Sequence, residues 1–290
     1  GNQTSSPGTS TYIIIQQKIE AQDIANSGWN YTSTSSFLTL SFWVKSSVAQ
    51  NFYGLLKTID GTQQGFPIET GSLSADTWTK VTYKIPGASG LQFDNNNDYG
   101  LDFRLSPYRG TSATGSVTLG QWGAYNSSLQ YPDSTTTWYT TNDSTFETTG
   151  WQLEVGSQVT PFEHRSFAEE LKLCKRYYQK SYAYGTAPGT ADSFLNQLVG
   201  RAYAAVSNRM ELNTRFEVEM RTTPTLTTYT PSGGSTGDVE DYSSGTGTAA
   251  GTARDVSAVR NLGNKGFGGI SVSPSQDGVL GLHYTAHAEL

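Results

Sequence analysis

The sequence has few of the residues on which several classes of protein depend. A single cysteine, Cys174, excludes an intrachain disulfide, and three scattered histidines are too few for a zinc site. The longest apolar run, residues 12–15, is far shorter than the ~20 residues that span a bilayer. We therefore expect no membrane insertion, and stability that comes from core packing and β-pairing.

Charged side chains are also scarce, at 15% of the chain, and the net charge is -6. Residues 1–165 carry 8 basic and 13 acidic side chains, and residues 166–290 carry 11 and 12. Neither half has an excess of positive charge. Because nucleic-acid binding needs a basic patch that neutralises phosphates, we expect no nucleic-acid partner.

Aromatic residues and glycines are abundant instead. The chain has 17 tyrosines, 12 phenylalanines, 6 tryptophans and 31 glycines in 290 residues. So much aromatic surface is atypical of a disordered chain. The length fits one large domain or two ordinary ones.

Apolar and polar residues alternate in short segments across residues 11–155, which is typical of half-buried strands. In residues 37–45, for example, Leu38, Leu40 and Phe42 share one face, and Trp43 lies on the other. The predicted strands cover residues 12–20, 37–45, 51–59, 78–85, 101–105, 117–125 and 146–155. This number of strands favours an antiparallel sandwich, and we predict a jelly roll.

One segment has the pattern of a helix. Ser166 and Glu169 have the spacing of a capping box. Four apolar or aromatic residues then recur at helical spacing, namely Phe167, Leu171, Cys174 and Tyr178. We predict a short linking helix over residues 167–179 and a buried, structural Cys174 on its apolar stripe.

A second β-rich region is expected after this helix. Strands are predicted at residues 215–221, 225–230, 256–262, 267–272 and 279–287, and a long loop at residues 232–252. The predicted fold class is therefore all-β, with an N-terminal jelly-roll β-sandwich, a linking helix and a smaller C-terminal β-sandwich. The expected domains are residues 1–164 and 165–290.

Residues 146–182 carry a long pattern, GxQLExGxxxTPFExRSxxEELxLCxRYY. It resembles a junction in virion proteins of tailed bacteriophages, especially marine phages and cyanophages. The last residues, 284–290, are similar to the ends of such chains. The resemblance implies a carbohydrate-binding-module-like jelly roll joined to a C-terminal β domain, in a tail fibre or appendage on the virion exterior. It also implies a homotrimer, contact with other virion proteins and binding to host-surface polysaccharide.

Trp43 is the strongest candidate for glycan contact, because an aromatic ring on a polar sheet face can hold a sugar ring. The alternative is that Trp43 belongs to the core. Asp102 and Arg104 can add polar contacts if their strand lies beside that of Trp43. Trp122 and Tyr125 are further candidates.

The segment DNNND at residues 94–98 offers clustered oxygen ligands, so Asp94 and Asp98 are candidates for a structural calcium ion. The spacing excludes an EF-hand, and a plain Asx-rich turn is the alternative reading. No other cofactor is expected. His283 and His287 have no third ligand nearby, so they predict no metal site.

No catalytic constellation is visible. The sequence has no G-x-S-x-G elbow and no phosphate-binding glycine loop. Carboxylate pairs are present, as in any acidic protein, but spacing alone does not make them a glycosidase site. We expect a non-enzymatic protein. The alternatives are a purely structural virion decoration or connector, and a polysaccharide depolymerase.

Overall fold

The computed structural model describes residues 6–192, 196–202, 209–242, 251–273 and 278–290. It divides into two compact units, which are residues 1–164 with Leu290 (unit 1) and residues 165–289 (unit 2). Both units are built almost entirely of β-strands, so the predicted all-β class is confirmed. Within the described ranges, no helix combines the length and hydrophobicity needed to span a bilayer.

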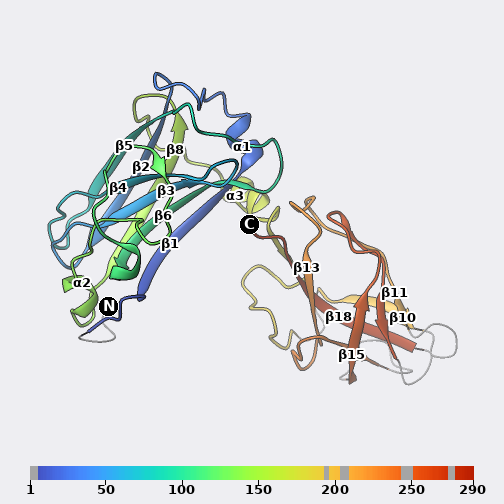
Figure 1. The fold of residues 1–290 in the computed structure, drawn as a ribbon. Helices are drawn as coiled ribbons and strands as arrows, with labels where there is room; N and C mark the ends of the chain where they lie inside the picture. Colours follow the sequence, from blue (N-terminus) through green and yellow to red (C-terminus); the bar gives the residue numbers. More distant parts are fainter. Residues whose placement is uncertain (1–5, 193–195, 203–208, 243–250, 274–277) are drawn as a thin grey trace. The chain divides into compact units, whose positions relative to one another are not determined.

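Unit 1 is a sandwich of two antiparallel sheets, whose strands appear in blue to green in Figure 1. The larger sheet has the order β1 (Tyr12–Glu20), β6 (Tyr99–Arg109), β3 (Tyr53–Thr58), β4 (Gln64–Glu69) and β7 (Gly123–Ala124). The smaller sheet has the order β5 (Thr79–Pro86), β2 (Phe37–Ser46) and β8 (Phe146–Val155). The chain passes repeatedly from one sheet to the other, as in a jelly roll.

The inward faces of these strands form one aromatic core. Phe42 is fully buried, and its ring stacks on Trp151 at a centroid distance of 4.1 Å. Phe103, from the opposite sheet, lies 5.2 Å from the same Trp151 ring. Large aromatic rings from both sheets therefore interdigitate and hold the two layers together.

Short helices complete unit 1: α1 (Ala21–Ala25), α2 (Thr137–Thr140) and the single 3₁₀ turn Thr111–Ala113. The predicted strand at residues 117–125 is wrong except for Gly123–Ala124, which pairs with β4. The rest is a loop. It is held in part by the Trp122 indole, which donates to the carbonyl of Pro86 at the end of β5, at 2.7 Å.

Polar side chains near the end of β8 form hydrogen bonds with the segment of the 146–182 pattern that follows this strand. The Glu154 carboxylate accepts hydrogen bonds from the Thr160 backbone N–H at 3.0 Å and hydroxyl at 2.6 Å. The Gln152 side chain accepts from the Glu163 N–H at 2.9 Å. Burial raises the pKa of Glu154, but these hydrogen bonds outweigh burial and lower it. The pattern thus fixes the path of the chain out of the sandwich.

In unit 2, helix α3 (Phe167–Cys174) begins at the predicted capping box, in which Ser166 accepts from the Glu169 N–H. The predicted helix end at residue 179 is wrong, because Tyr178–Lys180 forms strand β9 and pairs with β18. The prediction of a buried Cys174 is also wrong. Its side chain is exposed, since the apolar stripe of α3 faces no core and none of the helix residues is buried.

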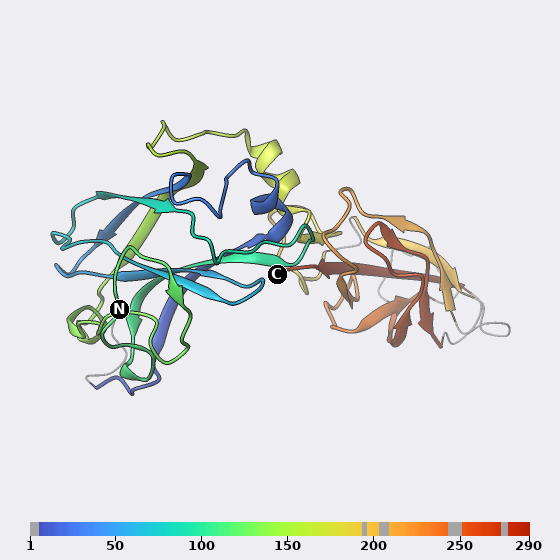
Figure 2. The same ribbon diagram turned by 45° about the horizontal axis from the view of Figure 1, so that its top comes forward.

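Unit 2 is organised around β18 (Gly278–His287), the long red strand in Figure 2. The other strands are β10 (Leu198–Ala202), β11 (Arg209–Glu211), β12 (Thr214–Arg215), β13 (Thr225–Tyr229), β14 (Asp238–Asp241), β15 (Thr252–Val259), β16 (Gly266–Phe267) and β17 (Ile270–Val272). The pairings run from β10 through β11, β17, β15 and β14 to β18, and β18 pairs with β10 again. These six strands therefore close into a ring.

Two predicted elements of unit 2 need correction. The predicted strand at residues 215–221 alternates in burial, but only Thr214–Arg215 pairs with another strand. Its Phe216 and Met220 N–H groups donate to the carbonyls of Lys265 and Asn264, so no ladder forms there. The predicted loop at residues 232–252 contains β14, and its residues 243–250 lie outside the described residues.

Candidate functional site

The outward face of the larger sheet of unit 1 brings several predicted residues together. Leu101, Phe103 and Leu105 of β6 point into the core, so Asp102 and Arg104 point outward. Across the sheet, Lys57 of β3 lies opposite Asp102. The sandwich thus fixes two cations and one carboxylate on a rigid surface.

Asp102 is fully buried beneath this face and is satisfied on both carboxylate oxygens. Arg104 donates to Oδ2 from Nε at 2.8 Å and lies 2.6 Å from it through Nη2, while Gln16 donates to Oδ1 at 2.8 Å. Burial alone lowers the pKa of Arg104, but the hydrogen bonds and charge of Asp102 raise it. Asp102 has no exposed surface, so it orients Arg104 and does not itself contact a ligand.

A hollow of about 350 Å³ is lined by Trp122, Tyr125 and Gln130, and Gln130 is a hydrogen-bond partner of Arg104. Strand β7 places these rings there, because it pairs with β4 at the edge of the sheet. Gly65 leaves room in the floor, since a Cβ on it would come within 3.3 Å of Leu55 Cδ1 and 3.8 Å of Tyr125 Cδ2. The predicted candidates Trp122 and Tyr125 thus line one hollow, and Arg104 is connected to it through Gln130. The Trp122 ring also packs on the core residue Phe66, at a centroid distance of 5.2 Å.

Two polar residues that sequence reasoning missed complete this surface. Lys57 Nζ lies 4.2 Å from the centre of the Tyr125 ring, a cation–π contact that fixes the ring. Burial, and then the charge of Arg104, lowers the pKa of Lys57. Gln130 accepts from Arg104 Nη1 at 3.3 Å and lines the hollow. We call Lys57, Arg104, Trp122, Tyr125 and Gln130 the sheet-face site.

Trp43 lies apart from this site. It is on β2 of the smaller sheet, whereas Asp102 and Arg104 are on β6 of the larger one, so the two strands are not neighbours. The side chain is 41% exposed, which excludes the alternative that it belongs to the core. Trp78, also 41% exposed, lies near the same face, where Lys45 stacks over its ring at 5.2 Å.

The segment at residues 94–98 forms a turn. The Asp98 N–H donates to the Asn96 side chain at 3.0 Å, and the carbonyls of Asp98 and Asn96 accept from the first N–H groups of α1. Both Asp94 and Asp98 are exposed. Within the described residues, no group of three or more acidic, histidine or cysteine side chains is placed to hold a metal ion. These contacts give the turn a structural role at the start of α1.

Unit 2 contains a Ser-His-Asp group that no sequence motif predicted. Ser181 Oγ lies 3.0 Å from His283 Nδ1, and Asp192 Oδ2 lies 4.0 Å from His283 Nε2. His283 is fully buried against Tyr182, whose ring stacks on it at 4.1 Å. Burial lowers the pKa of His283. Ser181 Oγ also accepts from the Tyr284 N–H at 2.9 Å, so this group helps to anchor β18.

No protein-family model matches the sequence, and no curated protein matches it. Among solved structures, the chain is similar to discoidin II from Dictyostelium discoideum, at 12% identity and a TM-score of 0.21, over 96% of this chain and 94% of that one. A similarity at this TM-score supports no conclusion about fold or function. The interpretation of the site therefore rests on its own geometry.

Proposed function

We propose that the protein is a non-enzymatic component of a tailed-phage virion and binds host-surface glycans through the sheet-face site. The observation that carries the proposal is the hollow of about 350 Å³ lined by Trp122, Tyr125 and Gln130, with the Arg104 guanidinium donating to Gln130 at 3.3 Å. Aromatic faces bind the apolar side of a sugar, and fixed polar groups bind its hydroxyls. Both kinds of group are present on one rigid sheet.

The place on the virion exterior and the homotrimer are part of the same proposal. They are supported by the resemblance of residues 146–182 to phage virion proteins. Strand β1 adds physical support for association between copies, because it is an edge strand with Tyr12, Ile13 and Ile15 exposed. Several weak sites on one oligomer bind a polysaccharide more tightly than one site alone.

A glycan array probed with the full-length oligomer tests this function. We expect binding to neutral sugars that falls about tenfold in Tyr125→Ala, because the ring supplies the stacking surface. Tyr99→Ala is the matched control, since Tyr99 is also a half-exposed tyrosine of unit 1 under a lysine, with Lys18 Nζ at 4.7 Å. Equal loss in both variants contradicts the assignment of the site. No binding at all favours the connector function.

One carboxylate pair bears on the depolymerase alternative. Asp238 and Asp255 are paired across β14 and β15, and burial, followed by the hydrogen bond to Asp255, raises the pKa of Asp238. Glycoside hydrolysis needs two carboxyl groups about 5–10 Å apart across the bond that breaks. Two carboxyls in direct hydrogen-bond contact leave no room for a sugar. Shortening of host polysaccharide by the protein, abolished by Asp238→Asn, would overturn this view.

A further inference from the structure

Unit 2 gathers arginines on one outward surface although the whole chain is acidic. Strands β10, β11, β17 and β15 are consecutive neighbours in the ring. Met210 and Ile270 are fully buried on the inner face, so Arg209 and its register partner Ser271 point outward. Arg260, which follows β15, lies on the other side of Ser271 and donates to its hydroxyl. The surface therefore has two arginines in one row.

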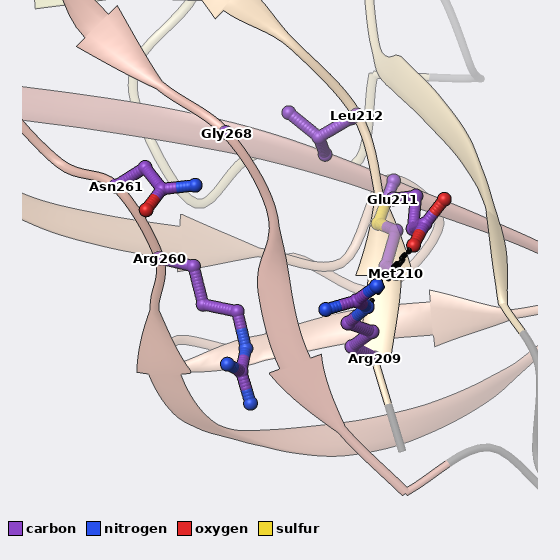
Figure 3. A pocket seen from close by; sticks show the side chains of 7 residues that line it. All are labelled: Arg209, Met210, Glu211, Leu212, Arg260, Asn261 and Gly268. Atoms are coloured by element: carbon purple, nitrogen blue, oxygen red, sulfur yellow. Dashed lines mark hydrogen bonds and ion pairs between the residues drawn. The ribbon is translucent and has the colours of Figure 1, made fainter. Parts of the chain in front are cut away.

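Both guanidinium groups are held in position by neighbouring side chains. Arg209 donates from Nε at 3.0 Å and from Nη2 at 2.6 Å to Glu211 Oε1. Arg260 Nε donates to Ser271 Oγ at 2.7 Å, and Ser271 is 7% exposed. Figure 3 shows the two arginines on either side of the strand that follows Gly268. The Nη groups of Arg260 remain available, so the site is oriented before a ligand arrives.

These arginines line a hollow of about 760 Å³ together with Asn261 and Gly268. A Cβ on Gly268 would lie 3.2 Å from Asn261 Cβ, so the glycine keeps this wall open. Asn261 itself has a left-handed φ of 50°. A second hollow of about 530 Å³ shares Leu212, Asn261 and Gly268 with the first. The two hollows therefore adjoin at these three residues, and we call them together a groove.

The second hollow adds two further cations, Arg215 and Lys265. We call Arg209, Arg215, Arg260, Asn261 and Lys265 the arginine groove. One carboxylate, Glu211, lines it, and Glu219 lies 3.5 Å from Lys265 at an exposed position. The cations in the groove therefore outnumber the carboxylates that line it. A planar guanidinium matches a carboxylate or a sulfate through paired hydrogen bonds.

The described residues that line the groove do not suit bases or neutral sugars. Their one aromatic residue, Phe267, is only 2% exposed, so these residues offer no ring for stacking. Single-stranded nucleic acids and uncharged glycans are usually held through such rings. We propose that the arginine groove binds an anionic polysaccharide, through sugar carboxylates or sulfate esters, independently of the sheet-face site.

Affinity electrophoresis of the full chain tests the proposal directly. Polygalacturonate and dextran sulfate in the gel are expected to retard the protein, whereas methyl-esterified polygalacturonate and dextran are not. Retardation should weaken as sodium chloride rises, because the contacts are electrostatic. Retardation by only one of the two polyanions identifies the anionic group. Retardation by neither polyanion overturns the proposal.

Variants locate the binding. Arg209→Gln combined with Arg260→Gln is expected to weaken binding of the retarding polyanion at least tenfold. The matched control is Arg165→Gln with Lys172→Gln, which removes the same charge from the segment around α3. Arg260→Lys keeps the charge but loses the planar fork, so we expect an intermediate loss even if the double variant folds poorly. Equal weakening in the control, or tighter binding to single-stranded DNA, contradicts the proposal.

This result is separable from the test of the sheet-face site. Tyr125→Ala is expected to leave retardation by polyanions unchanged, because Tyr125 lies in unit 1 and the groove in unit 2. The double arginine variant is expected to leave binding of neutral sugars unchanged on a glycan array. One proposal can therefore fail while the other stands.

Discussion

The two units reach stability by different routes. Unit 1 contains all 6 tryptophans of the chain, and its core is built from interlocking aromatic rings between two open sheets. Unit 2 contains no tryptophan and both methionines, and its core is mainly aliphatic inside a closed ring of strands. An open sandwich relies on ring-to-ring packing between its layers, whereas closure satisfies strand edges with backbone hydrogen bonds.

The surfaces of the two units also differ in the side chains that they expose. Unit 1 exposes aromatic rings beside fixed polar groups, whereas the described residues that line the groove of unit 2 expose arginines and no aromatic ring. A strand that packs its inward side chains into a core leaves its outward positions on the surface, and the two units carry different side chains at those positions. One chain thus presents two chemically distinct surfaces on two scaffolds.

The largest expected effect separates the two cores. Phe42→Ala removes a fully buried ring that stacks on Trp151, and we expect a loss of about 3–5 kcal/mol in unit 1. Leu282→Ala, also at a fully buried position, should cost unit 2 about 2–5 kcal/mol. Tryptophan fluorescence follows only unit 1, and circular dichroism follows both. A shift of the fluorescence transition by Leu282→Ala would show that the units do not unfold independently.

A smaller effect is expected at the sheet-face site. Asp102→Ala leaves the half-buried Arg104 without its carboxylate partner, and should cost about 1–3 kcal/mol. Glycan binding should fall as well, because Arg104 loses its orientation. Gln16→Ala is the milder control, since it removes one hydrogen bond to the same carboxylate. Unchanged glycan binding in Asp102→Ala, with normal folding, would remove Arg104 from the site.

Unit 2 should lose stability as the pH falls through the range in which histidine is protonated. Burial lowers the pKa of His283 below its ordinary value of 6.5, so the folded state binds the proton less well than the unfolded state. The stability that unit 2 gains from a neutral His283 is fully present above pH 6.5 and is lost as the pH falls below that value. The unfolding transition of unit 2, followed by circular dichroism, should therefore move to lower temperature as the pH falls in the wild type. In His283→Asn this dependence on pH should be weaker. The exposed His287→Asn serves as control, and an unchanged pH dependence in His283→Asn contradicts the assignment.

The smallest expected effect concerns Trp43. Since this side chain is 41% exposed, Trp43→Ala should change the stability of unit 1 by no more than about 0.5 kcal/mol. Thermal melting followed by circular dichroism measures this. A glycan array then shows whether the smaller sheet contributes: a loss of binding in Trp43→Ala at normal stability makes this face a second sugar platform.

Local patterns predicted the strands that have clear alternation. The bounds of β1 and β8 are the ones predicted from the sequence. Strand β2 ends one residue later than predicted, and β5 begins and ends one residue later. The capping box at Ser166 also formed as expected. These features depend on residues close together in the chain, where side-chain periodicity and hydrogen-bond partners are fixed by spacing alone.

Predictions failed where a partner distant in sequence decides the outcome. The helix after Ser166 ends at Cys174 because residues 178–180 pair with β18, and residues 216–221 form no strand because no ladder neighbour is available. Ring closure depends on the β10–β18 pairing, between segments about 80 positions apart. Alternation reports which side chains are apolar, but it does not report which strands meet.

The sequence by itself determined the all-β class, the most regular strands and the helix start. Only the tertiary structure decided that Trp122 and Tyr125 line one hollow with Gln130, that Trp43 lies on the other sheet, and that Arg209 and Arg260 flank Ser271. The physical reason is that the residues of each site come from different strands. Which strands are neighbours depends on the packing of the whole core.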